Sequence, residues 1–357
     1  MTGIIFLLCV PLLVGGASFL YFRDTISIKE FALQLLISVT LAVTGWMLAR
    51  HFSMKSTEHW NGRIISKNAG TESCCHCTTV CDARDKDGNC TSSHEECDHI
   101  YDNWWSVDVS TGDTLTDGCN GSSSPPGWWS AAYVGEPASV PHTYTNYLKA
   151  DPESLLHRFA DRRDLDTVPP FPEVHDYYKV SKVVTHNGAR APQHWQAQLM
   201  EINANLGDLR QVDVTVFLTT RPDPEFAHAV EAKWLYGPKN ALIVVMGTDR
   251  KTITWARVVT ISDVEELAIT LRDELPGRAL DDPELIKFIG RQIEEKFQRK
   301  PMADYEYLAS AARPRGWWLF GLYVLTLAIS GGLTLFMHAK DVFGDERLAR
   351  LRSLRRT

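Results

Sequence analysis

Three long apolar runs constrain the fold of this chain more than any other feature of its sequence. They cover residues 3–22, 31–49 and 317–337, and none of them contains a charged residue. Each is about as long as the roughly 20 residues that a helix needs to cross the hydrocarbon core of a bilayer. The sequence therefore predicts three transmembrane helices, of which the first two form a tight helical hairpin in residues 1–52.

A cleaved signal peptide is the alternative interpretation of the first run. Such a peptide begins with basic residues and ends at a cleavage site with small residues. Here no basic residue precedes the run, and a second apolar run follows at once. We therefore expect residues 3–22 to stay in the protein as a membrane anchor.

The distribution of positive charge predicts the orientation of the spans. Arg23 and Lys29 lie in the loop between the first two spans, and cytoplasmic loops are enriched in such residues. The tail, residues 339–357, carries six more cations: Lys340, Arg347, Arg350, Arg352, Arg355 and Arg356. We therefore expect the loop and the tail in the cytoplasm of a bacterium, and residues 52–315 on the periplasmic side of its inner membrane.

Net charge narrows the classes of partner. The whole chain carries a net charge of −7. Because the tail is positive, the remaining segment is more negative still, which argues against a nucleic-acid partner. The lipid bilayer is the first partner that the sequence predicts. The tail suits either a short helix on an anionic inner leaflet or a solvated basic end.

Seven cysteines lie in the large segment, six of them close together. They are Cys74, Cys75, Cys77, Cys81, Cys90, Cys97 and Cys119. Outside the cytoplasm such cysteines form disulfides, although their spacing does not give the pairing and their odd number leaves one over. Zinc is the alternative, because thiolate and imidazole are its preferred ligands and His76, His94 and His99 lie nearby. With zinc, the module would face the cytoplasm and mediate assembly there.

Residues 55–148 form the predicted cysteine-rich module. The stretches 59–67, 104–110 and 128–134 are typical of short strands separated by Gly, Asn, Asp and Ser. A small β module has a limited core, so we expect it to be stabilised by disulfides or metal. The Pro-rich and charged residues 149–192 predict a linker to the next domain, in which residues 177–185 have the pattern of a short strand.

Residues 193–305 alternate between helical and strand patterns. Apolar residues recur at helical spacing over 195–206, which predicts a helix that ends at Gly207. The runs 212–218 and 241–247 predict two strands of a parallel pair, joined by a right-handed crossover through a helix. The second run is continuously apolar, as expected for a strand covered on both faces.

The remaining elements complete an α/β sandwich. Asp223 and Pro224 predict the start of the crossover helix. Residues 252–260 predict a hairpin partner for the preceding strand, and Ser262 with Glu265 predicts a capping box. A last helix places four apolar residues at intervals of four: Leu285, Ile289, Ile293 and Phe297.

A family resemblance is carried by residues 233–258, which read KWLYGPKNALIVVMGTDRKTITWARV. This stretch resembles the TPM domain, a module of a thylakoid-lumen acid phosphatase, a photosystem repair factor and an auxiliary protein of an acetylcholine receptor. In that family a Trp precedes a Gly-Lys-Asn-like turn and two strands, and the matching residues are Trp234, Gly237, Lys239 and Asn240. The resemblance covers residues 195–305 and implies a membrane-tethered, extracytoplasmic module.

The cysteine segment and residues 135–149, which read GEPASVPHTYTNYLK, also resemble uncharacterised membrane proteins of bacteriophages and prophages. That resemblance implies an origin but no activity.

A catalytic site would have to come from clustered carboxylates. A TPM-like phosphatase needs acids that hold a divalent cation near a phosphate, and the candidates are Asp213, Asp249, Asp281 and Asp282. They form no motif, and the chain has no phosphate-binding glycine loop, nucleophile elbow or His-Glu-x-x-His helix. The sequence specifies no cofactor. Zinc at the cysteines or calcium at the acids would suit the residue types.

The sequence thus predicts a membrane protein with three transmembrane α-helices, a small cysteine-rich β module and a TPM-like α/β sandwich. We expect it to act as an adaptor or scaffold that binds envelope or phage proteins, or further copies of itself. A metal-dependent phosphatase is the alternative.

Overall fold

The computed structural model describes residues 2–22, 25–73, 77–84, 90–97, 101–117, 124–151, 153–154, 158–234, 238–314, 316–340 and 342–343. The chain divides into two units. We call Met1–Ser56, Thr145–Arg158 and Met302–Thr357 the helical unit. We call Thr57–Tyr144 and Phe159–Pro301 the globular unit.

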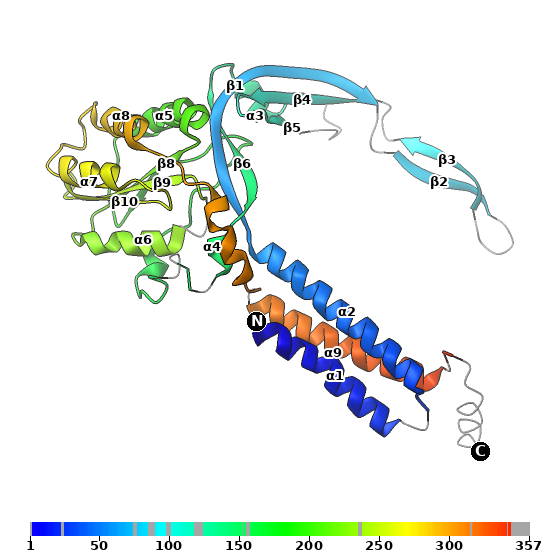
Figure 1. The fold of residues 1–357 in the computed structure, drawn as a ribbon. Coiled ribbons are helices and arrows are strands. Elements are labelled where there is room, and N and C mark those ends of the chain that lie inside the picture. The colour runs from blue at the N-terminus through cyan, green and yellow to red at the C-terminus, as the bar shows by residue number, and fades with distance from the viewer. Residues whose placement is uncertain are drawn as a thin grey trace. The chain divides into compact units, whose positions relative to one another are not determined.

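Three long helices run side by side in the helical unit (Figure 1). They are α1 (Thr2–Tyr21), α2 (Ile28–Ser53) and α9 (Gly316–Ala339). Each is long and apolar enough to cross a membrane, so the three predicted apolar helices are confirmed as helices. The unit also holds the short helix α4 (Tyr147–Ala150) and the 3-10 helix η4 (Met302–Ser310). The predicted basic tail beyond residue 343 lies outside the described residues.

Hydrogen bonds between polar side chains join the three long helices. Gln34 Nε2 donates to the Ser330 carbonyl (3.0 Å) and to Thr334 Oγ1 (2.8 Å). Ser330 Oγ donates to Ser38 Oγ (3.1 Å), and Thr334 Oγ1 lies 2.9 Å from Ser18 Oγ. Hydrocarbon offers no water to such groups, so an interhelical partner is the favourable alternative, worth about 0.6–2 kcal/mol per bond.

The N-terminal part of the globular unit is built from strands. A four-stranded sheet has the order β5-β4-β1-β6, and β2 and β3 form a separate antiparallel hairpin. Their bounds are β1 (Lys55–Ser73), β2 (Cys77–Arg84), β3 (Cys90–Cys97), β4 (Tyr101–Val109), β5 (Thr114–Thr116) and β6 (Pro137–Thr145). The strands predicted at 59–67 and 104–110 are confirmed as parts of β1 and β4.

The strand predicted at 128–134 is wrong, because this segment forms the short helix α3 (Gly127–Ala131). Pro126 stands at its N-cap, where the missing backbone N–H of proline costs no helical hydrogen bond. On a strand, Trp128 and Trp129 would point to opposite faces. Successive residues of a helix are only about 100° apart, so both rings pack against the same core, around Val107 and Ala132.

A second four-stranded sheet, with the order β10-β9-β8-β7, forms the α/β part of the globular unit. Strands β7, β8 and β9 are parallel, and β10 returns antiparallel to β9. The strands are β7 (Val183–His186), β8 (Asp213–Thr219), β9 (Ala241–Thr248) and β10 (Ile253–Val259). The predicted parallel pair and hairpin are confirmed, and β7 comes from the stretch predicted as a linker.

Helices cover both faces of this sheet (Figure 1). One face is packed by α5 (His194–Arg210), α7 (Glu265–Glu274) and α8 (Leu285–Lys296). The other carries α6 (Ala227–Trp234), preceded by the 3-10 helix η3 (Pro224–Phe226). The 3-10 helix η2 (Leu165–Thr167) contacts α6.

Side chains along β8 point alternately to the two faces of the sheet. Val214, Val216 and Leu218 are fully buried in the cluster formed with α5, α7 and α8. Phe217 points the other way and contacts Trp234, with ring centroids 5.2 Å apart. All eight residues of β9 are buried, as its continuously apolar run predicts.

Two predicted helix boundaries are wrong. Helix α5 continues through Gly207 to Arg210, and Gln211 then adopts the left-handed conformation that ends it. Helix α7 begins without a side-chain cap, and its N-cap is Val264. The Ser262 hydroxyl instead accepts a hydrogen bond from the Lys300 backbone at 3.4 Å, so it does not form the capping box with Glu265. The Asp223 cap is confirmed, since its side chain accepts from the Glu225 backbone.

Candidate functional site

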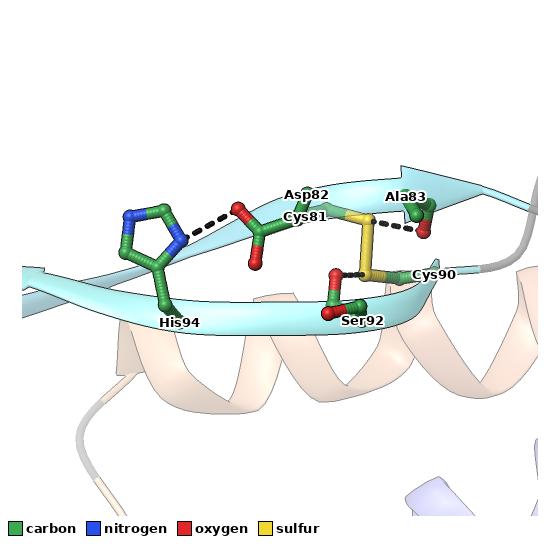
Figure 2. Close-up of a disulfide and its surroundings, with 6 residues drawn as sticks. All are labelled: Cys81, Asp82, Ala83, Cys90, Ser92 and His94. Atoms are coloured by element: carbon green, nitrogen blue, oxygen red, sulfur yellow. Dashed lines mark hydrogen bonds and ion pairs between the residues drawn. A yellow bond between two sulfur atoms is a disulfide. The ribbon is translucent and has the colours of Figure 1, made fainter.

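A disulfide links the two strands of the β2–β3 hairpin. Cys81 and Cys90 are bonded, with Cα atoms 5.8 Å apart (Figure 2). Beside them, the His94 Nδ1 atom lies 2.6 Å from Asp82 Oδ1, and both side chains are exposed. Cys77 is disulfide-bonded as well. The hairpin is therefore an oxidised module.

The other predicted cysteine and histidine ligands are not brought together in the part of the chain that is described. Cys74, Cys75, His76, His99 and Cys119 lie outside the described residues, as does Gly237 of the TPM-like turn. Cys97 ends β3. Because oxidised sulfur cannot serve as a thiolate ligand, Cys81 and Cys90 are lost to a zinc site. Within the described ranges, no three His, Cys, Asp or Glu side chains are placed to hold a metal ion.

The candidate acids take separate structural roles. Asp249 lies in the β9–β10 turn, where its Oδ1 accepts hydrogen bonds from the Lys251 and Thr252 backbone at 2.8 and 2.7 Å. Those hydrogen bonds lower the pKa of the Asp249 carboxyl. Asp282 Oδ1 accepts from the Glu284 backbone at 2.9 Å, and Asp281 is exposed beside it. Asp249 and Asp282 therefore each accept backbone hydrogen bonds from residues two or three positions further along the chain.

Asp213 alone is fully buried, and it forms an ion pair with the equally buried Lys182. Its Oδ1 also accepts a hydrogen bond from Asn61 Nδ2 at 3.0 Å. Its Oδ2 lies 3.3 Å from His59 Nδ1, close enough to form an ion pair when the imidazole is protonated. Burial alone would raise the pKa of Asp213, but the Lys182 charge and the His59 contact outweigh it and hold the pKa below its usual value.

A cleft of about 720 Å³ opens beside β7 in the same unit. One wall is the segment from Lys179 to Val183, the floor is the first half of α5, and the loop that leads into β6 closes the other side. Ligand pockets of proteins have volumes of about 300–1,000 Å³. Its lining includes Glu136, Pro137, Lys179, Val183, Met200 and Glu201.

The β7 wall of this cleft is held in place by hydrogen bonds to a side chain of α5. Gln196 of α5 accepts hydrogen bonds from the Lys182 and Val183 backbones at 2.8 and 3.2 Å and donates to the Val180 carbonyl at 2.8 Å. The Lys182 side chain is buried against Asp213, whereas its neighbours Ser181 and Val183 line the cleft. The buried ion pair therefore positions the wall and does not take part in the cleft itself.

Tyr178 anchors the opposite end of the wall. It is fully buried, and its hydroxyl donates to Glu136 Oε2 at 3.0 Å. Burial raises the pKa of Tyr178, and the bond to the carboxylate adds to this, so the phenol stays protonated. Asp176 and Tyr177, next to it, both have positive φ angles, 47° and 70°. Such backbone costs about 1–3 kcal/mol per residue and persists where neighbouring contacts impose it.

Sequence reasoning did not find this cleft. Its wall lies in the stretch predicted as a linker, and Glu136, Lys179 and Gln196 belong to no motif. The strand pattern of residues 177–185 overlaps β7 in part, but a strand pattern does not indicate a cleft. Comparison with known proteins adds no assignment, because the chain matches no protein-family model, no curated protein and no solved structure.

Proposed function

We propose that this protein is a membrane-anchored adaptor whose segment between the second and third spans lies outside the cytoplasm and binds other envelope or phage proteins. One observation carries the proposal: the Cys81–Cys90 disulfide lies in that segment. Disulfides persist in the periplasm and on cell surfaces and are rare in the reducing cytosol.

The proposed sidedness agrees with the arrangement of the helices. Three spans place the two ends of the chain on opposite sides of a membrane. If the segment from α2 to α9 is outside, the α1–α2 loop, Lys29 in the first turn of α2 and the arginine-rich tail are inside. This is the distribution that the positive-inside rule favours. A bacterial inner membrane with a periplasmic globular unit is the corresponding localisation.

Binding rather than catalysis is favoured by the positions of the acids. Asp249 and Asp282 cap backbone groups, and Asp213 is neutralised by Lys182. A divalent-metal phosphatase of TPM type would need such carboxylates around one ion. Hydrolysis of a phosphomonoester by the purified full-length chain in a metal-dependent way would therefore contradict the adaptor proposal.

Thiol labelling in intact spheroplasts tests the sidedness. Cys9 lies in α1 and is a free thiol, so a Cys9→Ala background removes it. A membrane-impermeant maleimide is expected to leave this protein unlabelled before reduction, except at an unpaired cysteine, and to label it several-fold more after mild reduction. The reason is that the cysteines of the segment are exposed to the medium as disulfides.

A matched control uses the other end of the chain. In the same background, Thr357→Cys should be protected in intact spheroplasts and should label after lysis. The proposed orientation would be contradicted by the opposite pattern, in which the segment cysteines react only after lysis and Thr357→Cys is labelled in intact spheroplasts.

Partner binding is tested separately with a photo-crosslinking residue at Thr79, which is exposed on β2. An adaptor should crosslink to discrete envelope proteins in intact cells, whereas the same residue at Leu36, exposed on α2, should capture mainly lipid. Crosslinks to cytosolic proteins alone would contradict the proposal.

A further inference from the structure

We propose that the cleft beside β7 binds a short extended peptide that carries one positive and one negative side chain, with the positive group at Glu136 and the negative group at Lys179. The inference rests on the proposed function only in that the peptide would belong to an envelope protein. Its argument depends on the volume of the cleft and on which charges of its lining are already compensated.

Glu136 carries a charge that no cation offsets among the described residues. Its Oε2 accepts hydrogen bonds from two neutral groups, the Tyr178 hydroxyl at 3.0 Å and the Tyr133 backbone at 3.3 Å. A carboxylate with only neutral partners retains its full electrostatic attraction for an added cation. Glu136 is partly exposed in the cleft, so a ligand can reach it.

Lys179 is the matching cation. Its Nζ lies 5.8 Å from the centroid of the Tyr178 ring, and no carboxylate of the described chain pairs with it. The other charges of the lining are already compensated: Glu201 pairs with Arg63, and His175 lies 3.2 Å from Asp176. The two uncompensated charges therefore have opposite signs and lie around one buried tyrosine.

The rest of the lining includes apolar side chains, which are those of Pro137, Val180, Val183, Pro192, Ala197 and Met200. A cleft of about 720 Å³ lined by apolar and polar side chains has room for a ligand larger than a single amino acid. A nucleotide carries charge of one sign, and an acyl chain carries none along its length, so neither uses both Glu136 and Lys179. A peptide with opposite charges on either side of apolar residues can contact Glu136, Lys179 and the apolar part of the lining.

The wall is also preorganised. Gln196 fixes the backbone of three wall residues, and the Lys182–Asp213 pair holds the side behind it. Preorganisation improves affinity because fewer groups lose conformational freedom on binding.

Calorimetry with four tetrapeptides tests the inference on the full-length chain in lipid nanodiscs. All are N-acetylated and C-amidated, so that only side chains carry charge: Lys-Val-Val-Glu, Gln-Val-Val-Glu, Lys-Val-Val-Gln and Gln-Val-Val-Gln. The doubly charged peptide should bind about tenfold or more tightly than the neutral one, with the singly charged peptides in between.

Two variants test which charged residue of the cleft binds which end of the peptide. Glu136→Gln should weaken binding of Lys-Val-Val-Glu by about five- to tenfold, yet leave Gln-Val-Val-Glu unchanged, because only the lysine contact is lost. Lys179→Gln should show the opposite pattern. Glutamine at 136 can still accept the Tyr178 hydrogen bond, so the fold is retained, and an unchanged thermal midpoint verifies this. Matched controls are Glu173→Gln and Lys251→Gln, which are exposed outside the cleft and should change nothing.

Equal binding of all four peptides, no binding of any, or variants indistinguishable from the parent would overturn the inference. These outcomes are separable from a failure of the proposed function, since both faces of a nanodisc are open to the ligand. If the peptides bind in a charge-dependent way but thiol labelling places the segment in the cytoplasm, only the proposed sidedness is contradicted. If labelling places the segment in the periplasm but no peptide binds, only the peptide site is contradicted.

Discussion

Replacing Asp213 with asparagine is expected to destabilise the globular unit by about 3–5 kcal/mol. The substitution leaves the Lys182 ammonium buried without its counter-charge, and both side chains are fully buried in the native protein. For a unit of this size, each kcal/mol lowers the melting temperature by about 2–4 °C, so the transition should shift down by about 6–20 °C. Tryptophan fluorescence during heating of the full-length chain in nanodiscs measures this.

A double variant separates the lost charge from lost packing. Lys182→Met combined with Asp213→Asn removes both charges, while asparagine still accepts the hydrogen bond from Asn61. Most of the stability should return, because replacing a buried pair by uncharged groups is often close to neutral. Asp281→Asn, at an exposed acid, is the matched control and should leave the midpoint unchanged. A single Asp213→Asn variant as stable as the parent would rule out the ion pair as a major contributor.

The same pair predicts how the stability difference depends on pH. The pKa of Asp213 is lower in the folded protein than the value of about 3.9 for an unfolded chain. Its contribution is therefore fully present above about pH 4 and is lost as the pH falls through the folded pKa. The gap between the melting temperatures of the parent and Asp213→Asn should be largest near neutral pH and should narrow below about pH 4. A gap that widened on acidification would contradict this assignment.

Replacing Gly207 with alanine is the second large effect that we expect. In an ordinary helix the change would stabilise α5 by about 1 kcal/mol. Here a Cβ atom would lie 1.9 Å from the backbone oxygen of Asn61 on β1. Asn61 cannot retreat easily, since its side chain bonds to Asp213 and Ser139. We expect overpacking to cost about 3 kcal/mol, which leaves a net loss of about 2 kcal/mol and a midpoint lower by about 4–8 °C.

Gly290→Ala provides the graded control for this prediction. It also lies inside a helix, α8, but the atom that its Cβ would meet is the Cδ1 of Ile202 at 2.8 Å. The end of a flexible side chain moves at little cost, so the helical gain should roughly cancel the crowding. If Gly207→Ala proved no worse than Gly290→Ala in the same melting experiment, the close approach of β1 to α5 would be wrong.

Periodicity made the α/β part of the chain predictable. The apolar run of β9, the Asp223 cap and the four-residue spacing from Leu285 to Phe297 are local signals, and the structure bears them out. Local signals failed where a contact from elsewhere in the chain decided the outcome. Glycine often marks the end of a helix. At Gly207 the missing side chain instead allows the close approach of the β1 backbone, and the helix continues. Ser262 lies at the right spacing for a cap, but it bonds to Lys300 instead.

In the candidate site, too, residue types could be identified from the sequence, whereas contacts between residues far apart in the chain could not. The hairpin cysteines could be identified by residue type, but their oxidation depends on two strands bringing Cys81 and Cys90 together. The sequence offers Asp213 as one of several candidate acids for a divalent cation, and only the fold shows Lys182 against it. The cleft could not be predicted, since its walls come from three separate stretches without a motif.

By itself, the sequence determined the three apolar helices and the parallel pair of β8 and β9, because both depend on the hydrophobicity of neighbouring residues, which a single chain displays directly. Only the tertiary structure decided that Lys182 neutralises Asp213, that Gly207 makes room for β1, and that Glu136 and Lys179 share a cleft. These pairings join residues far apart in the chain, and the free energy that fixes them comes from burial, which exists only after folding.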